Sequence, residues 1–364
     1  MNDTLLSIQS FGSIFVEIFV GIVVVALVAM LCYLIKEIVC SSAVDSESAQ
    51  SKKKDKHPEG KNRQVVRESS GTTAEPLELE YNPELPRDNK NETGKWEAQW
   101  AAQYEAVVGL KHRNANPPLP CQDAALSRVA PRPLLIVADG AGSAEVSEIG
   151  AQTVVRALAR LIHTRDAELG ELLDNKGGSE KQARKFALSL VKHAIGVQED
   201  LAAEHRRPQD DFRSTLLMII VGTAYIMWLK IGDGALVLES IQNGDNQDIT
   251  LTTELRILGE AGKGEYANST TFIGTGLMPA DVQTGLISAE NICGLAAMSD
   301  GAAERLVSGV KVAGRVRSLL HDLRNDALSR PDLGRMFYSD EFTGKGKGVF
   351  TGDDCALALL SHKV

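Results

Sequence analysis

Aspartates recur in this chain at the ends of apolar runs, and three of them are followed directly by glycine. Asp139 ends the run LLIVAD, Asp233 closes YIMWLKIGD, and Asp300 follows GLAAMS. Asp123 and Asp353 instead stand just before short apolar segments. A single Asp-Gly pair is typical of a tight turn, but the strands of a core hold their ends rigidly. Several acids at such ends can therefore converge on one site.

Carboxylates brought together in this way suit hard divalent cations. A set of oxygen ligands without histidine or cysteine favours Mg²⁺ or Mn²⁺ over zinc. Two such ions about 3.5–4 Å apart bind one shared water, lower its pKa and stabilise both oxygens of an in-line phosphoryl displacement. The cations would also offset the repulsion among buried acids. We expect the glycine beside each acid to let water or substrate approach the backbone closely.

The elements that must position these acids follow from the spacing of apolar residues. Residues 151–162 carry an apolar stripe at helical spacing, and Ser179 with Gln182 predicts a capping box at the start of a second helix. Strand-like runs then follow at 214–221, 223–231, 235–239 and 249–253. Because short connections join these runs, we expect antiparallel hairpin pairing. Strands bunched between helices indicate α+β layers rather than regular βαβ alternation.

The N-terminus differs in character from the rest of the chain. Residues 18–35 are uncharged and mostly apolar, and together with residues 11–16 they are long enough to cross a bilayer, which needs roughly 20 residues. We predict a short extracytoplasmic segment at 1–12 and a transmembrane helix at 13–36. A cleaved signal peptide is the alternative, but the basic segment that begins such peptides is missing and the apolar run is too long.

Charge gives the orientation of the predicted span. Asp3 precedes the span and Glu17 lies near its outer end, whereas lysines and arginines cluster from Lys36 to Arg67, and this excess marks the cytoplasmic side. Residues 37–94 are polar and without apolar periodicity, and lysines and arginines gather in their first half, which predicts a disordered basic linker. Residues 95–364 are predicted to be one folded domain. We therefore expect a single-pass protein of the cell membrane that contacts the lipid bilayer through residues 13–36, with its folded domain in the cytoplasm.

Composition excludes other classes of protein. The net charge of −9 argues against a nucleic-acid partner. The five cysteines are scattered and no pair has CxxC spacing, so neither a zinc site nor a disulfide framework is indicated.

The motifs occur in an order that resembles the metal-dependent protein phosphatases of type 2C, with the bacterial branch closest. The matching segments are Gln122-Asp123, VADGAGS at 137–143, IGDG at 231–234, SDG at 299–301, Asp353-Asp354, GLKH at 109–112 and GEYAN at 264–268. The resemblance spans about residues 96–360. It implies an α+β fold, a four-layer α-β-β-α sandwich of two antiparallel sheets flanked by helices.

The resemblance also implies metal ligands by motif position. Asp139 would bridge two Mg²⁺ or Mn²⁺ ions, and the backbone carbonyl of Gly140 would join one of them. Asp300 and Asp353 would complete the coordination of one ion, while Asp123 would act through waters or at the second ion.

Two further acids are assigned by position alone. Asp233 falls where the family anchors a third, more loosely held ion, although it is also typical of a hairpin turn. Asp354 stands where the family commonly has asparagine, and we expect it only to support the site.

Three positions depart from the family pattern. Gln122 replaces a common glutamate, and Ala141 replaces a histidine proposed as general acid in some relatives. Pro118 stands where an arginine grips the substrate phosphate. His112 and Arg113 are the nearest substitutes for binding substrate, since both side chains can bind a phosphate.

The implied function is that of a membrane-anchored, metal-dependent protein phosphatase acting on phosphoserine and phosphothreonine. A water activated by two metal ions would attack phosphorus, with Asp139 and Asp123 as the catalytic acids. Phosphorylated proteins and an opposing Ser/Thr kinase would be its partners. The missing arginine and histidine leave a second hypothesis, a catalytically inactive scaffold that binds phosphoproteins at the membrane. A calcium-binding module is disfavoured because its acids lie within one loop.

Overall fold

The structure is a computed structural model that describes residues 93–242, 252–260, 270–308, 311–339, 342 and 352–363. All of these residues belong to one unit, Asn82–Val364. The predicted extracytoplasmic segment, the predicted transmembrane helix at 13–36 and nearly all of the predicted linker lie outside the described residues. Within the described residues, no helix combines the length and the apolar composition that crossing a bilayer requires.

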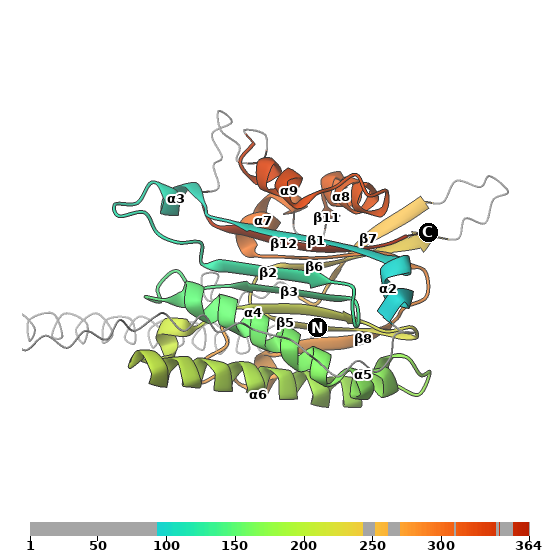
Figure 1. Cartoon of the computed structure of the whole chain (residues 1–364), viewed down its shortest axis with the longest axis horizontal. Helices are drawn as coiled ribbons and strands as arrows, with labels where there is room; N and C mark the ends of the chain where they lie inside the picture. The colour runs from blue at the N-terminus through green and yellow to red at the C-terminus, as the bar shows by residue number, and fades with distance from the viewer. Residues whose placement is uncertain are drawn as a thin grey trace, which may run out of the picture. The chain divides into compact units, whose positions relative to one another are not determined.

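Two five-stranded antiparallel sheets face one another (Figure 1). The first sheet has the order β1-β12-β9-β6-β7. Its strands are β1 Trp100–Val107, β12 Cys355–His362, β9 Ile292–Met298, β6 Ala235–Gln242 and β7 Thr252–Leu258. The second sheet has the order β2-β3-β4-β5-β8. Its strands are β2 Asp123–Arg128, β3 Leu134–Asp139, β4 Leu216–Val221, β5 Tyr225–Ile231 and β8 Gln283–Ser288.

Helices cover the outer face of each sheet (Figure 1). The second sheet is covered by α4 Ser147–Thr164 and α6 Glu180–His205, which pack into one apolar cluster with it, and α5 Asp166–Leu173 joins them. The first sheet is covered by α7 Asp300–Leu306, α8 Gly314–Arg324 and α9 Arg330–Phe337. The predicted four-layer α-β-β-α sandwich is therefore confirmed for this part of the chain.

Shorter elements complete the description. The chain enters through α2 Thr93–Gln99, and α3 Leu110–Arg113 follows β1. The remaining elements are η1 Gln209–Phe212, η2 Pro279–Asp281, β10 Val307–Ser308 and β11 Lys311–Val312.

Strand β3 shows why its sequence is apolar without alternation. Successive side chains of a strand point to opposite faces. Leu134, Ile136 and Ala138 pack toward the helices, whereas Leu135 and Val137 pack into the core between the sheets. All five are fully buried. A strand covered on both faces has to be apolar throughout, up to the residue where the layer ends.

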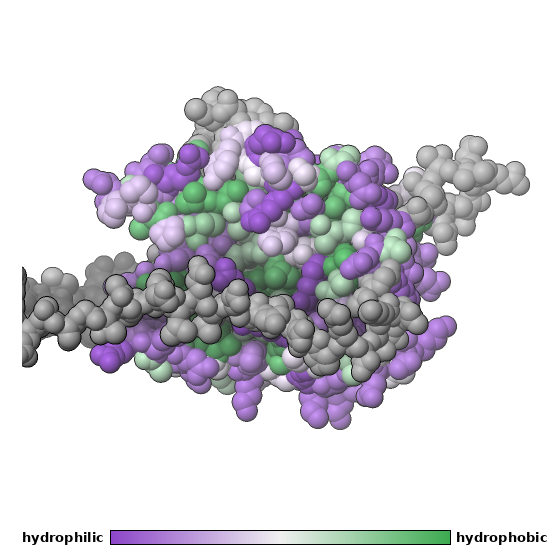
Figure 2. Space-filling view, viewed as in Figure 1, coloured by the Kyte–Doolittle hydropathy of each residue, from purple (hydrophilic) through white to green (hydrophobic). Residues whose placement is uncertain are grey.

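The two predicted helix signals are confirmed. The predicted stripe of α4 is buried, with Val154, Leu158 and Ile162 at 0% exposure. At the start of α6, Ser179 N donates to Gln182 Oε1 at 3.1 Å, and Gln182 N donates to Ser179 Oγ at 3.4 Å. Figure 2 shows the result on one face of the molecule, where hydrophilic residues cover the outer helices and hydrophobic residues gather in the strand layers between them.

The expected hairpin pairing holds for β4 with β5 and for β6 with β7, but it is wrong for β5 with β6. Strand β6 pairs with β7 and β9 in the opposite sheet. The chain crosses between the sheets at Gly232-Asp233-Gly234, where Gly232 has a φ of +108° and a Cβ on Gly234 would lie 2.4 Å from the Met298 carbonyl oxygen. Asp233 is therefore not a hairpin acid; it lies where the chain passes from one layer to the next.

Candidate metal centre

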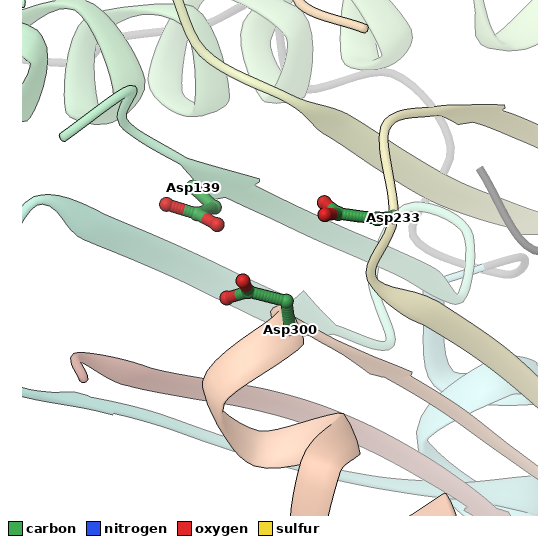
Figure 3. Close-up of side chains that lie close together, drawn as sticks. All are labelled: Asp139, Asp233 and Asp300. Atoms are coloured by element: carbon green, nitrogen blue, oxygen red, sulfur yellow. The ribbon is translucent and has the colours of Figure 1, made fainter. Parts of the chain in front are cut away.

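Three of the predicted acids meet where the two sheets end (Figure 3). Asp139 ends β3, Asp233 lies in the β5–β6 crossover, and Asp300 is the first residue of α7. One carboxylate oxygen from each lies within 4.8 Å of the others. Three acids that are far apart in the sequence thus form one cluster of oxygen ligands.

Asp123 adjoins this cluster from the neighbouring strand. It begins β2, and the antiparallel register places it opposite Asp139. Its side chain is 3% exposed, and its Oδ2 has no hydrogen-bond partner among the described residues. Asp233 Oδ1 is also buried and has no partner in the part of the chain that the structure describes, whereas Asp233 Oδ2 accepts a hydrogen bond from Thr270 Oγ1 at 2.7 Å. Buried polar atoms are normally paired, so these open oxygens call for a ligand from outside the chain.

The electrostatics of the cluster point the same way. Burial raises the pKa of Asp123 well above its usual range, and the charges of Asp354 and Asp300 raise it further. Burial, followed by the charges of Asp123 and Asp300, also raises the pKa of Asp139. Burial and the charge of Asp233 raise the pKa of Asp300 to about 6. Burial and mutual repulsion disfavour the charged forms of these acids, and bound divalent cations would offset that repulsion.

Asp353, which the resemblance also assigns as a ligand, lies at the exposed edge of the cluster. Its side chain is 50% exposed, and its Oδ2 lies 4.0 Å from Lys111 Nζ. Its charge contributes to the raised pKa of Asp300, so it lies near that residue. It is not among the three acids whose oxygens lie within 4.8 Å of one another. Asp353 is therefore placed at the rim of the cluster.

Backbone hydrogen bonds fix Asp139 and Gly140. Thr215 N donates to the Asp139 carbonyl oxygen at 2.8 Å, and Asp139 N donates to Thr215 Oγ1 at 2.9 Å. Gly140 N donates to the Gln122 carbonyl oxygen at 3.1 Å. The segment that carries the central acid is thus held from both sides, by Thr215 just before β4 and by Gln122 just before Asp123.

Asp354 is a buried acid that supports the site through contacts with distant segments of the chain. Its side chain is 3% exposed and accepts three hydrogen bonds. Oδ1 accepts from Gly109 N at 2.6 Å, while Oδ2 accepts from Gln122 N at 2.6 Å and bonds to His112 Nδ1 at 3.0 Å. This one carboxylate ties the start of β12 to the segments that precede β2. Its place beside Asp353 was the only signal in the sequence.

His112 is connected to the site through Asp354, whereas Arg113 contacts Tyr338. Asp354 fixes His112 Nδ1, and the His112 side chain is 17% exposed. The guanidinium carbon of Arg113 lies 4.9 Å from the centre of the Tyr338 ring. Neither residue belongs to the group of mutually close acids.

The glycines beside the acids have a different purpose from the one predicted. A Cβ on Gly301 would lie 2.1 Å from the Asp354 carbonyl oxygen, and a Cβ on Gly140 would lie 2.8 Å from the Gln122 carbonyl oxygen. These contacts are with the protein backbone, not with open space. Glycine is required because the chain segments that carry the acids pack against one another at backbone distance.

The residues present therefore fit divalent cations. The donors are carboxylate oxygens, which hard cations such as Mg²⁺ and Mn²⁺ prefer. Two of the four buried or half-buried acids, Asp123 and Asp233, have an oxygen that the described part of the protein leaves unpaired.

The chain is similar to a known protein family and to several solved structures. The sequence profile of the family described as protein phosphatase 2C matches residues 108–336, which is more than half of the 364 residues. A bacterial serine phosphatase structure is 14% identical, with 72% of this chain and 97% of that chain covered and a TM-score of 0.48. The comparison with curated proteins found no match.

Two further solved structures are similar at the same level. The serine/threonine phosphatase PstP/Ppp of Mycobacterium tuberculosis is 14% identical, with 72% of this chain and 98% of that chain covered and a TM-score of 0.47. Stp1 from Staphylococcus aureus is 14% identical, with 71% and 94% covered and a TM-score of 0.46.

Proposed function

This chain belongs to the protein phosphatase 2C family and is a phosphoprotein phosphatase, and from that premise we propose that it is a membrane-anchored enzyme that hydrolyses phosphoserine and phosphothreonine with the help of two Mg²⁺ or Mn²⁺ ions. The convergence of Asp139, Asp233 and Asp300 carries the proposal. The open oxygens of Asp123 and Asp233 support it, because a catalytic cation site needs buried ligands that the protein has not already paired.

The residues that would hold the ions are Asp123, Asp139, Asp300 and Asp353, with the carbonyl of Gly140, and Asp233 would hold a third ion. Bound divalent cations supply Lewis acidity, which lowers the pKa of a water molecule and neutralises charge on the transferring phosphoryl oxygens. In this proposal Asp139 and Asp123 are the catalytic acids, because they lie opposite each other on β3 and β2 at the buried end of the site.

The chain's own contacts keep this donor set in place. Thr215 bonds to both the amide nitrogen and the carbonyl oxygen of Asp139 and so fixes its backbone. Asp354 orients the segment before Asp123 and holds Nδ1 of His112. With Nδ1 engaged, Nε2 of His112 is left for a phosphate oxygen, and Arg113 is the second predicted substrate contact.

We propose the anchoring on the sequence alone. The apolar residues 13–36 would cross the bilayer, and the lysine-rich stretch after them would remain on the cytoplasmic side with the catalytic domain. Phosphorylated cytoplasmic proteins and an opposing Ser/Thr kinase would be its partners. Deleting residues 1–36 should move the protein from the membrane fraction to the soluble fraction, and no change in fractionation would contradict the anchor.

The decisive experiment for the activity is a metal-dependent turnover assay on the full chain. We expect hydrolysis of a phosphothreonine peptide with Mn²⁺, loss of hydrolysis with EDTA, and recovery when Mn²⁺ is restored. Asp139→Asn should be inactive, whereas Asp322→Asn, a control at an exposed acid of α8, should match the wild type. A wild-type protein that binds phosphopeptide without metal and turns over none of it would support the inactive scaffold instead.

A further inference from the structure

Arg213 lies beside the metal centre in the segment that precedes β4. Its carbonyl oxygen accepts a hydrogen bond from Ala141 N at 3.1 Å, and the next residue, Ser214, forms a β-bridge with Gly140. Thr215 then pairs with Asp139. The chain around Arg213 therefore runs antiparallel to the loop that leaves the central acid.

The Arg213 side chain lies between two segments that lead to acids of the cluster. Its Nη2 donates to Ser143 Oγ at 2.6 Å, in the loop that follows Asp139. Its guanidinium carbon lies 5.7 Å from the centre of the Phe272 ring, two residues beyond Thr270, which donates to Asp233. The guanidinium is thus held on both sides by segments connected to the site.

The positive charge of Arg213 is not neutralised by the described part of the protein. Its contacts there are a hydroxyl group and an aromatic ring, and its Nε is buried without a hydrogen-bond partner. Arg207, on the same side of the fold, is different: its guanidinium is paired with Glu145 and Asp211. An arginine that is positioned but lacks an acid is suited to bind an anion.

We propose that Arg213 binds the phosphate of the substrate and replaces the arginine that is missing at Pro118. A guanidinium presents several donors in a planar fork and can bind two phosphate oxygens at once. Ser143 and Phe272 hold it in one orientation. This inference rests on the proposed phosphatase function and adds to it the residue that binds the phosphate group of the substrate.

The test compares four variants of the full chain with the wild type, in detergent with Mn²⁺. The measured quantities are kcat and KM for a phosphothreonine peptide and the inhibition constant of inorganic phosphate. Arg213→Ala and the neutral Arg213→Gln should raise KM and the inhibition constant about tenfold and change kcat by less than about threefold. Arg213→Lys should recover part of the loss, because it restores the charge but not the fork. Arg207→Ala is the matched control and should behave like the wild type.

The outcomes separate this inference from the proposed function. If Arg213→Gln retains the wild-type inhibition constant for phosphate in an active enzyme, the inference is overturned. If Arg213→Ala fails to fold, the Gln and Lys variants decide. If the wild type turns over no phosphopeptide, the phosphatase proposal fails; calorimetry with inorganic phosphate then tests Arg213 alone, and binding that Arg213→Gln does not weaken overturns it.

Discussion

Buried carboxylates occur in two different settings in this chain. Glu239 in β6 is 1% exposed and is paired with protein groups: Arg324 Nη2 lies 2.9 Å from its Oε2, and Thr253 Oγ1 donates to its Oε1 at 2.8 Å. At the metal centre, Asp123 is 3% exposed and Asp139 lies opposite it on the neighbouring strand. No arginine or lysine of the described residues forms an ion pair with either acid.

The difference distinguishes a structural acid from a ligand. The Glu239 charge is matched by Arg324, which also donates to the Cys293 and His362 carbonyl oxygens and so anchors α8 to the first sheet. The acids of the metal centre repel one another, and two of them have an oxygen that no described residue pairs. Removing one partner of a buried ion pair destabilises the fold, because the other charge is left buried and uncompensated. A group of buried acids without basic partners instead favours a bound cation.

Replacing an acid of the metal centre should have the largest effect on activity. Asp300→Asn removes one ligand oxygen and one charge from the cluster, so turnover with Mn²⁺ should fall by about a thousandfold or more. Its melting temperature in EDTA should be unchanged or higher, because repulsion is relieved. Turnover and thermal denaturation, measured on the same preparation, test the loss of activity and the change in melting temperature. A variant that retained a tenth of wild-type turnover would remove Asp300 from the ligand set.

Replacing the structural acid should have the opposite pattern. Glu239→Gln leaves Arg324 without its charged partner, and breaking a buried pair costs about 3 kcal/mol of unfolding free energy. Denaturant titration should show this loss while kcat stays at the wild-type value. Glu290→Gln, at an exposed acid, is the control and should change neither quantity. A loss of kcat at wild-type stability would contradict the distinction between the two settings.

The stability of the metal-free protein should depend on pH in a defined window. The pKa of Asp300 is about 6, raised from the ordinary 3.8 by burial and by the charge of Asp233. The stability that this group contributes is therefore fully present below about pH 4 and is lost as the pH rises through about 6. In EDTA, the melting temperature of the wild type should fall by several degrees relative to Asp300→Asn across this window. Saturating Mn²⁺ should abolish the fall, and a flat difference in EDTA would refute the assignment.

The smallest effect is expected at His112. His112→Ala should raise KM for a phosphopeptide by about threefold to tenfold, because one phosphate contact is lost and the acids remain in place. Steady-state kinetics on the full chain measure it, and His163→Ala, at an exposed position of α4, provides the control. Equal KM values for the two variants would show that His112 does not bind substrate and acts only through its bond with Asp354.

Much of the site could be predicted because its signals are local. A strand buried on both faces must be apolar until its layer ends, so Asp139 marks the end of β3 in the sequence itself. The capping box at Ser179 is likewise encoded within four residues. The order of the acids along the chain was sufficient to predict one cluster and the cations that would suit it.

The sequence could not predict contacts between distant segments. Asp354 bonds to Gly109 and Gln122, which lie 245 and 232 residues away, and a carboxylate with such partners looks in the sequence like any other acid beside a strand. The crossing at Asp233 was mistaken for a hairpin, since short connections occur both within a sheet and between sheets.

The sequence by itself determined where the acids stand, which residues are apolar enough to bury, and that oxygen ligands for hard cations are available. The tertiary structure alone decided that Asp233 joins Asp139 and Asp300 while Asp353 lies at the rim, and that Arg213 remains without an acid among the described residues. The physical reason is that apolar spacing encodes the burial of each segment, whereas the meeting of polar groups depends on how two separately built layers pack together.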